Sequence, residues 1–290
     1  MLAQNGAFLL PNRVHLLRQV SNWGAGKIAS PENRPLKLLF MACSAQEVTP
    51  KLDFENEEET IFRVTEKLPI DMEVEDSGSL EGLRQRLETE AFDVVNISGH
   101  ADIDYNSQPF FIMEDETGRR RDVFPPKLWR DALIENKENL RLLFLSGCRT
   151  GETPPEQATT SFAQQLVENF NVPAVLSWGR SVADDQATVA EEFIYHELSR
   201  GRDLLAAVQR ARQELLDRFQ DSPDQTWPLL RLYGSGMLPQ AIVTKGQKAR
   251  PKPRLLVHTF LKQSQVQVLQ TGFVGRRRQL QQSLQALRHD

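Results

Sequence analysis

The chain has 290 residues, of which 40% are hydrophobic and 26% are charged, and its formal net charge at pH 7 is −4. A chain of this length can bury a sizeable core without metal or disulfide staples, and two cysteines cannot make a disulfide framework. The mild acidity argues against binding to nucleic acid through net positive charge. No apolar run reaches the roughly 18 residues of a membrane span, and the N-terminus lacks a signal-peptide core. We therefore expect a cytoplasmic protein with reduced thiols.

Strand and helix patterns alternate along most of the chain. Residues 1–35 end in a stretch rich in Gly, Ser, Pro and Asn, which is typical of a lead-in or linker. The pattern then predicts a strand at 36–43, a helix at 54–68, a strand at 70–76, a helix at 80–90 and a strand at 92–100. It continues with a β-hairpin at 110–124, a helix at 125–137, a strand at 140–148, a helix at 160–169, a strand at 172–178, helices at 184–199 and 203–219, and a strand at 227–236.

Strands separated by helices predict a mostly parallel, six-stranded sheet with helices on both faces. In sheets of this kind, functional sites lie beyond the carboxyl ends of the strands. His100 and Cys148 each stand at that end of a predicted strand. Their placement favours chemistry at this edge before any motif is considered.

The composition changes after Gly236. Residues 246–254 are basic and contain prolines, which is typical of a linker. A short strand pattern, LLVHTF, and a closing helical segment, RRRQLQQSLQALR, are too short to fold as a domain of their own. We therefore divide the chain into a lead-in (1–35), a main domain (36–240) and a linker with the start of a further module (241–290).

The strongest candidate for a catalytic pair is Cys148 with His100. A cysteine becomes a strong nucleophile as its thiolate, so it needs a proton acceptor nearby. His100 precedes Cys148 by 48 residues, and caspase sequences place their histidine about 50 residues before a Q-A-C-[RQG]-G cysteine. Cys148 lies in Ser-Gly-Cys-Arg-Thr-Gly, where small residues leave amides free to face an oxyanion. The amides of Ala101 and Cys148 are the candidate donors.

The alternative for any cysteine at a strand end is that it is a small buried apolar residue. Cys43 also ends a predicted strand, but its surroundings, MACSAQ, offer no partner motif. We interpret Cys43 as a packing residue.

The two motifs, VVNISGHADI and LLFLSGCRTGE, resemble the CHAT family of caspase-like peptidases. The downstream stretch VPAVLSWGRSVADDQATVAEEFIYHELSRGRDLLAAVQRAR and the closing Trp…Leu-Tyr-Gly strand are similar to that family as well. The resemblance covers roughly residues 36–240. It implies a caspase-like three-layer sandwich and an endopeptidase that cleaves protein substrates through His100 and Cys148, with no metal or cofactor. Ala101 and Gly147 depart from the family pattern, which has Gly and Ala there, but both are small and leave the amides available.

The resemblance also places part of the substrate pocket after the strand that ends at Trp178, near Asp184 and Asp185. Caspase-like peptidases select the residue before the cleaved bond by charge, so an acidic pair would favour Arg or Lys. The alternative is equally open, because Asp at the start of a helix is a common N-cap.

Residues 272–280, GFVGRRRQL, resemble the segment that leads into STAND-type signalling ATPases, although the 290 residues contain no P-loop. The resemblance implies control by an adjoining ATPase, with oligomerisation through that module, and the family implies a role in bacterial defence or cell death. The alternative function is a catalytically silent caspase-like adaptor, which the intact His and Cys pair disfavours.

Overall fold

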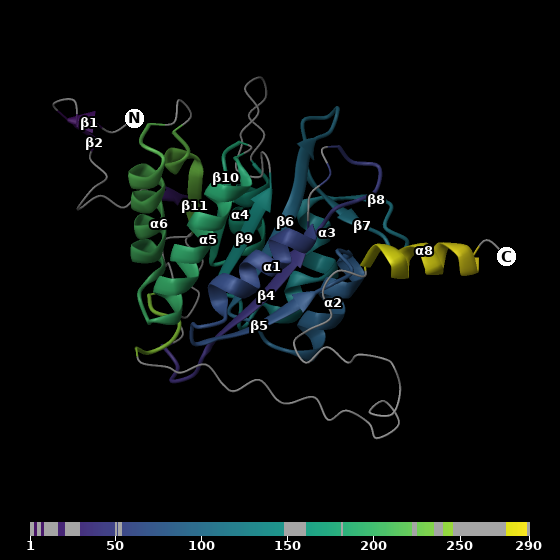
Figure 1. The fold of residues 1–290 in the computed structure, drawn as a ribbon, viewed down its shortest axis with the longest axis horizontal. Coiled ribbons are helices and arrows are strands. Elements are labelled where there is room, and N and C mark those ends of the chain that lie inside the picture. Colours follow the sequence, from purple (N-terminus) through teal and green to yellow (C-terminus); the bar gives the residue numbers. More distant parts are fainter. Residues whose placement is uncertain are drawn as a thin grey trace.

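The computed structural model describes residues 3–4, 7–8, 17–20, 30–49, 51, 54–147, 161–180, 182–221, 225–234, 240–245 and 277–288. Its centre is a twisted sheet with helices on both faces (Figure 1). The strand order across the sheet is β3 (Arg18–Gln19), β11 (Leu230–Gly234), β10 (Ala174–Trp178), β9 (Leu142–Gly147), β6 (Val94–Ile103), β4 (Leu36–Ala42) and β5 (Ile70–Glu75). A separate antiparallel ribbon joins β1 (Ala3–Gln4) and β2 (Ala7–Phe8).

The sheet is mostly parallel, as the sequence predicted. Five neighbouring strands of the sheet run parallel to one another: β5, β4, β6, β9 and β10. Beyond them, β11 runs antiparallel to β10, and β3 adds a short parallel edge beside β11. All six predicted strands are present. The fold class inferred from the sequence is therefore confirmed, with β3 as an addition from the lead-in.

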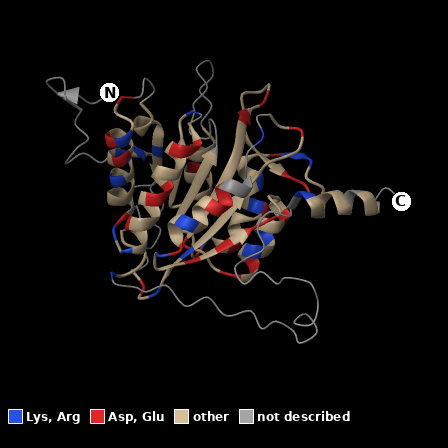
Figure 2. Cartoon of the chain, viewed as in Figure 1, with Lys and Arg blue, Asp and Glu red and all other residues tan. Residues whose placement is uncertain are grey.

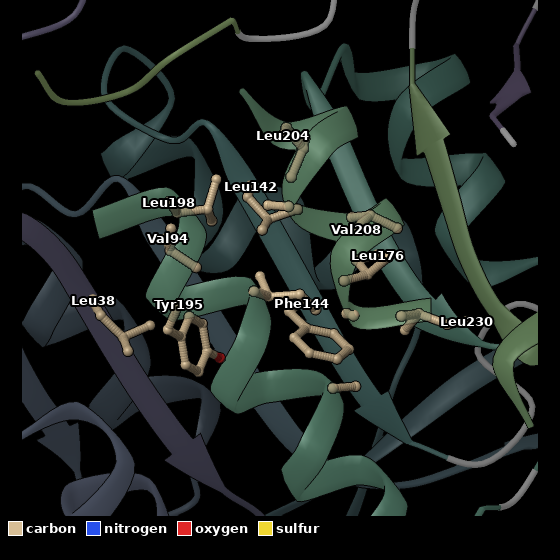
Figure 3. Close-up of a cluster of buried hydrophobic side chains, with 14 of the residues drawn as sticks. Leu38, Val94, Leu142, Phe144, Leu176, Tyr195, Leu198, Leu204, Val208 and Leu230 are labelled. Carbon is tan, nitrogen blue, oxygen red and sulfur yellow. The ribbon is translucent and has the colours of Figure 1, made fainter. Parts of the chain in front are cut away.

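Helices cover each face of the sheet. One face carries α1 (Phe54–Thr65), α5 (Asp184–Ser199) and α6 (Leu204–Arg218), and the other carries α2 (Leu80–Thr89), α3 (Pro125–Asp131) and α4 (Phe162–Phe170). Alternate residues of the strands pack into two apolar layers, one on each face of the sheet. Figure 3 shows part of the layer under α5 and α6, with Leu142, Phe144 and Leu176 beneath these helices. Strands buried on both faces explain the near-continuous apolar runs in the sequence.

Two predicted elements differ in detail. The helix expected at 125–137 breaks after Asp131 and resumes as a 3₁₀ turn, η1 (Leu133–Asn136). The break lets Asn136 bond both backbone groups of Phe92, at 3.1 and 2.8 Å. The strand expected from residue 227 begins with a 3₁₀ turn, η2 (Trp227–Leu229), because Pro228 has no N–H to give to a sheet ladder.

The predicted β-hairpin is confirmed as β7 (Pro109–Glu114) and β8 (Arg120–Val123), and its turn uses the positive φ of Gly118, +82°. It attaches to the sheet because the last part of β6 continues past its parallel partners and pairs antiparallel with β7. His100 therefore lies where β6 leaves the main sheet and joins the hairpin.

The closing helical segment forms α8 (Arg277–Arg288), which extends away from the hairpin in Figure 1. Its N-terminal part is attached to the end of β7: Arg278 and Gln281 donate to the buried carboxylate of Glu114, at 3.1 and 2.7 Å. Arg278 also donates to the backbone oxygen of Ser44. The LLVHTF pattern lies outside the described residues, and the division of the chain at residues 35 and 240 stays a prediction.

The surface carries both signs of charge, and Figure 2 shows acidic and basic residues interspersed over the helices. Among the helices that the structure describes, none combines the length and the apolar character that a membrane crossing needs.

Candidate active site

The parallel part of β6 ends level with the carboxyl end of β9. The register pairs Val94 with Leu142 at one end and Gly99 with Gly147 at the other, so the two strands stay in step over their shared length. His100 follows Gly99 within β6 and is half-buried. Cys148 follows Gly147 directly and lies outside the described residues.

The glycine before His100 is required by close packing. A Cβ at Gly99 would lie 2.8 Å from the ring of Phe111 and 3.1 Å from the Cβ of Cys43, so a side chain there would force the buried Phe111 ring to shift. Cys43 is 1% exposed within the α2 and α4 apolar layer, which confirms it as a packing residue. Ala101, the predicted oxyanion donor after His100, is 9% exposed and pairs with Phe111 of β7.

A buried polar cluster lies beneath these strand ends, on the face covered by α1 and α5. Asn96 of β6 donates from Nδ2 to Oε1 of Glu191, at 3.0 Å, and to the hydroxyl of Tyr195, at 2.6 Å. Figure 3 shows Tyr195 on α5 pointing toward the sheet among apolar neighbours. The hydroxyl of Ser98, two residues further along β6, donates to Glu57 of α1.

The environment of Glu191 changes its titration. Burial raises the pKa of the Glu191 carboxyl to about 8, and the nearby Glu57 carboxylate adds to the increase, while hydrogen bonds from Asn96 and Ser146 oppose it. Burial also raises the pKa of Tyr195 well above its usual range. Glu191 therefore holds a proton at neutral pH.

This cluster is not among the features that the sequence predicted. Its signal was the pair of polar residues, Asn96 and Ser98, in the otherwise apolar strand VVNISGH, together with Glu191 four residues before Tyr195 on one helical face. Isolated polar residues on a buried strand need partners from the covering helices.

The predicted pocket residues lie in two different environments. Asp184 and Asp185 are exposed in the first turn of α5, where the helix dipole favours carboxylates. The N-cap position is taken by Ala183, and Asp185 accepts a hydrogen bond from the backbone N–H of Gln186 at 2.8 Å. Trp178 ends β10 with 1% exposure, inside the apolar layer beneath α5. A role for these three residues in substrate binding stays a prediction.

Among the described residues, no group of three or more His, Cys, Asp and Glu side chains is arranged to hold a metal ion.

A family model described as the CHAT domain matches residues 3–282. The chain belongs to the CHAT domain family. This confirms the family that the His and Cys motifs predicted, and with it a cysteine peptidase type of fold; the STAND-type ATPase stays a prediction. No curated protein matches the CHAT chain.

Several solved structures are similar to this CHAT chain at low identity. The Arg-specific cysteine proteinase gingipain R is 10% identical, with a TM-score of 0.49 over 73% of this chain and 50% of its own. Caspase-1 from Spodoptera frugiperda is 12% identical, with a TM-score of 0.45 over 80% of this chain and 98% of its own. The Drosophila initiator caspase Dronc is 10% identical, with a TM-score of 0.44 over 80% and 97%.

Replacing Glu191 with Gln tests whether the buried carboxyl group holds its proton at neutral pH. A carboxyl with its pKa raised from 4.5 to about 8 in the folded state adds stability that is complete below pH 4.5 and is lost as the pH rises through 8. This group alone should lower the free energy of unfolding by about 1.4 kcal/mol per pH unit across that window. Denaturant unfolding between pH 5.5 and 8 should show the decline in the natural chain and a smaller slope in Glu191→Gln.

The matched control is Glu192→Gln, because Glu192 is the next residue of α5 and is not buried. That variant should keep the slope of the natural chain. Equal slopes in all three proteins would contradict a proton held by Glu191.

Proposed function

We propose that the chain is a cysteine endopeptidase that cleaves protein substrates, with Cys148 as nucleophile and His100 as its base. The observation that carries the proposal is the level pairing of Gly99 with Gly147. Neighbouring strands lie about 4.8 Å apart, and the next Cα along a chain is about 3.8 Å away. Residues that continue these two strands by one position would start within side-chain reach of each other, which supports the pair.

The proposed chemistry follows from the residue types. His100 accepts the proton of the Cys148 thiol, and the thiolate attacks the carbonyl carbon of the cleaved peptide bond. The amides of Ala101 and Cys148 donate to the oxyanion that forms. His100 then returns the proton to the leaving amine, and water hydrolyses the acyl-enzyme. None of these steps requires a metal or a cofactor.

We extend the proposal to substrate choice. The exposed carboxylates of Asp184 and Asp185 begin α5, shortly after β10, and they would favour Arg or Lys before the cleaved bond. Trp178, packed at the end of β10, would support the wall of that pocket.

We also propose control by an adjoining ATPase or sensor module, in a bacterial defence or cell-death system within the cytoplasm. The resemblance of residues 272–280 supports this, and so does the attachment of α8. Arg278 is bound to Glu114 of β7, and Ile112 of the same strand pairs with His100. A movement of α8 could reach the strand of His100 through β7. A longer chain that carries the ATPase should cleave faster when it oligomerises.

The first test concerns the pair itself. Cys148→Ala and His100→Ala should each lower cleavage by at least roughly a thousandfold, because nucleophile and base act as a unit. The measurement is a proteome-wide map of new N-termini produced by the natural chain and by each variant.

Thiol labelling supplies the control. Cys148 should react faster with iodoacetamide than Cys43, which is 1% exposed, and should react more slowly in His100→Ala. If both variants retain normal cleavage, or if a correctly folded natural chain produces no new N-termini, the peptidase proposal fails, and the latter result favours the silent adaptor.

The second test concerns the pocket. Asp184→Asn or Asp185→Asn should reduce the preference for Arg and Lys over neutral residues by about tenfold, as expected for the loss of one charge pair in a partly screened site. Peptide libraries that vary the residue before the cleaved bond measure it. Asp217→Asn, an exposed aspartate on α6, is the control. An unchanged preference in both α5 variants would rule out these carboxylates as the pocket.

A further inference from the structure

Two carboxyl groups lie between the sheet and its covering helices, close to these strand ends. Glu191 of α5 is 2% exposed, and Glu57 of α1 is half-buried. Burying a carboxyl group costs free energy unless it is ion-paired, hydrogen-bonded or protonated. The position of these two groups next to the strands of the proposed catalytic pair therefore calls for an explanation.

Each carboxyl is bonded to the strand that carries one member of the proposed pair. Glu57 accepts from the hydroxyl of Ser98, and Glu191 is hydrogen-bonded to the side chain of Ser146. Ser98 and Ser146 are register partners on β6 and β9, and the Ser98 hydroxyl also reaches the backbone oxygen of Ser146 at 3.4 Å. The two serines thus connect the helices to both strand ends at the same level.

The serines precede the proposed pair by two residues. Ser98 stands two before His100, and Ser146 two before Cys148. Strand residues two apart lie on the same face, so along β6 the side chains of Asn96, Ser98 and His100 follow one another on the α5 side. The cluster therefore supports the strands from the same face as His100.

The charges around Glu191 favour its neutral form. Glu57 faces it from α1 and Tyr195 from its own helix, while the contacts from β6 and β9 come from the neutral side chains of Asn96 and Ser146. Among the described residues, no Lys or Arg is bonded to Glu191. Two carboxylates in one buried cluster repel each other, so one of them keeps its proton.

We propose that Glu191 is a positioning residue of the peptidase: in its neutral form it ties α5 to β6 and β9 and fixes the spacing of His100 and Cys148. This role rests on the proposed function, and it acts through Asn96 and Ser146 without contact to the substrate. Ionisation of Glu191 places a second anion beside Glu57, and the repulsion separates the helices from the strand ends.

The test is the rate at which Cys148 is alkylated by iodoacetamide between pH 6 and 9.5, measured on the full chain by mass spectrometry of the labelled peptide. In the natural chain the rate should rise with the thiolate fraction and then fall above about pH 8. Glu191→Gln keeps the neutral hydrogen bonds, so its rate at pH 7 should stay within about threefold of the natural chain and should not fall at high pH. Glu191→Ala should react at least about tenfold more slowly at pH 7.

Glu192→Gln is the control on the same helix and should follow the natural chain. Near-ultraviolet circular dichroism establishes that each variant is folded, and Glu191→Gln decides the question alone if Glu191→Ala does not fold. The inference is overturned if the folded Gln variant has the pH profile of the natural chain, or if it loses reactivity at pH 7.

Labelling separates this inference from the proposed function because it requires no substrate cleavage. If Cys148 labelling depends on Glu191 as described but no protein is ever cleaved, the positioning role stands and the peptidase proposal fails. If cleavage depends on Cys148 and His100 but is indifferent to Glu191, the peptidase stands and the positioning role fails.

Discussion

The proposed site depends on one constraint: β6 and β9 stay in parallel register up to a pair of glycines, Gly99 and Gly147. Their register is fixed by packing on both faces: Val94 and Phe144 enter one apolar layer, and Val95 and Leu145 enter the other. A slip of one residue would exchange the two faces and turn the polar side chains of Asn96 and Ser98 away from their partners on α5 and α1, into the apolar layer under α2 and α4. The core therefore sets the level at which Gly99 and Gly147 meet.

The same strands change character along their length. Their first residues are apolar, whereas Asn96, Ser98 and Ser146 bring polar groups into a layer that is otherwise hydrophobic. Most of these groups find partners on α1 and α5, but among the described residues the Oδ1 of Asn96 has none. A buried polar atom without a partner costs about 1–3 kcal/mol. This unfavourable contribution to the folding free energy lies close to the proposed site. Such a contribution is expected where a defined geometry matters more than maximal stability.

The sequence predicted the strands, most helices and the hairpin because buried strands and amphipathic helices leave strong periodic signals. It did not predict the break after Asp131, which depends on Asn136 reaching the distant backbone of Phe92. Nor did it reveal the cluster around Glu191, because its bonds to Asn96 and Ser146 join residues far apart in the chain. Local patterns carry no information about such partners until the topology is known.

The proposed peptidase activity requires His100 and Cys148 to meet at this edge of the sheet. The decisive measurement is a crystal structure of the chain after reaction with a peptide electrophile that ends in Arg. We predict a covalent bond from the electrophile to the Sγ of Cys148, with a ring nitrogen of His100 within roughly 4 Å of that sulfur. An unlabelled Cys148, or a His100 ring more than about 10 Å from its sulfur, far beyond hydrogen-bonding reach, would contradict the proposed pair.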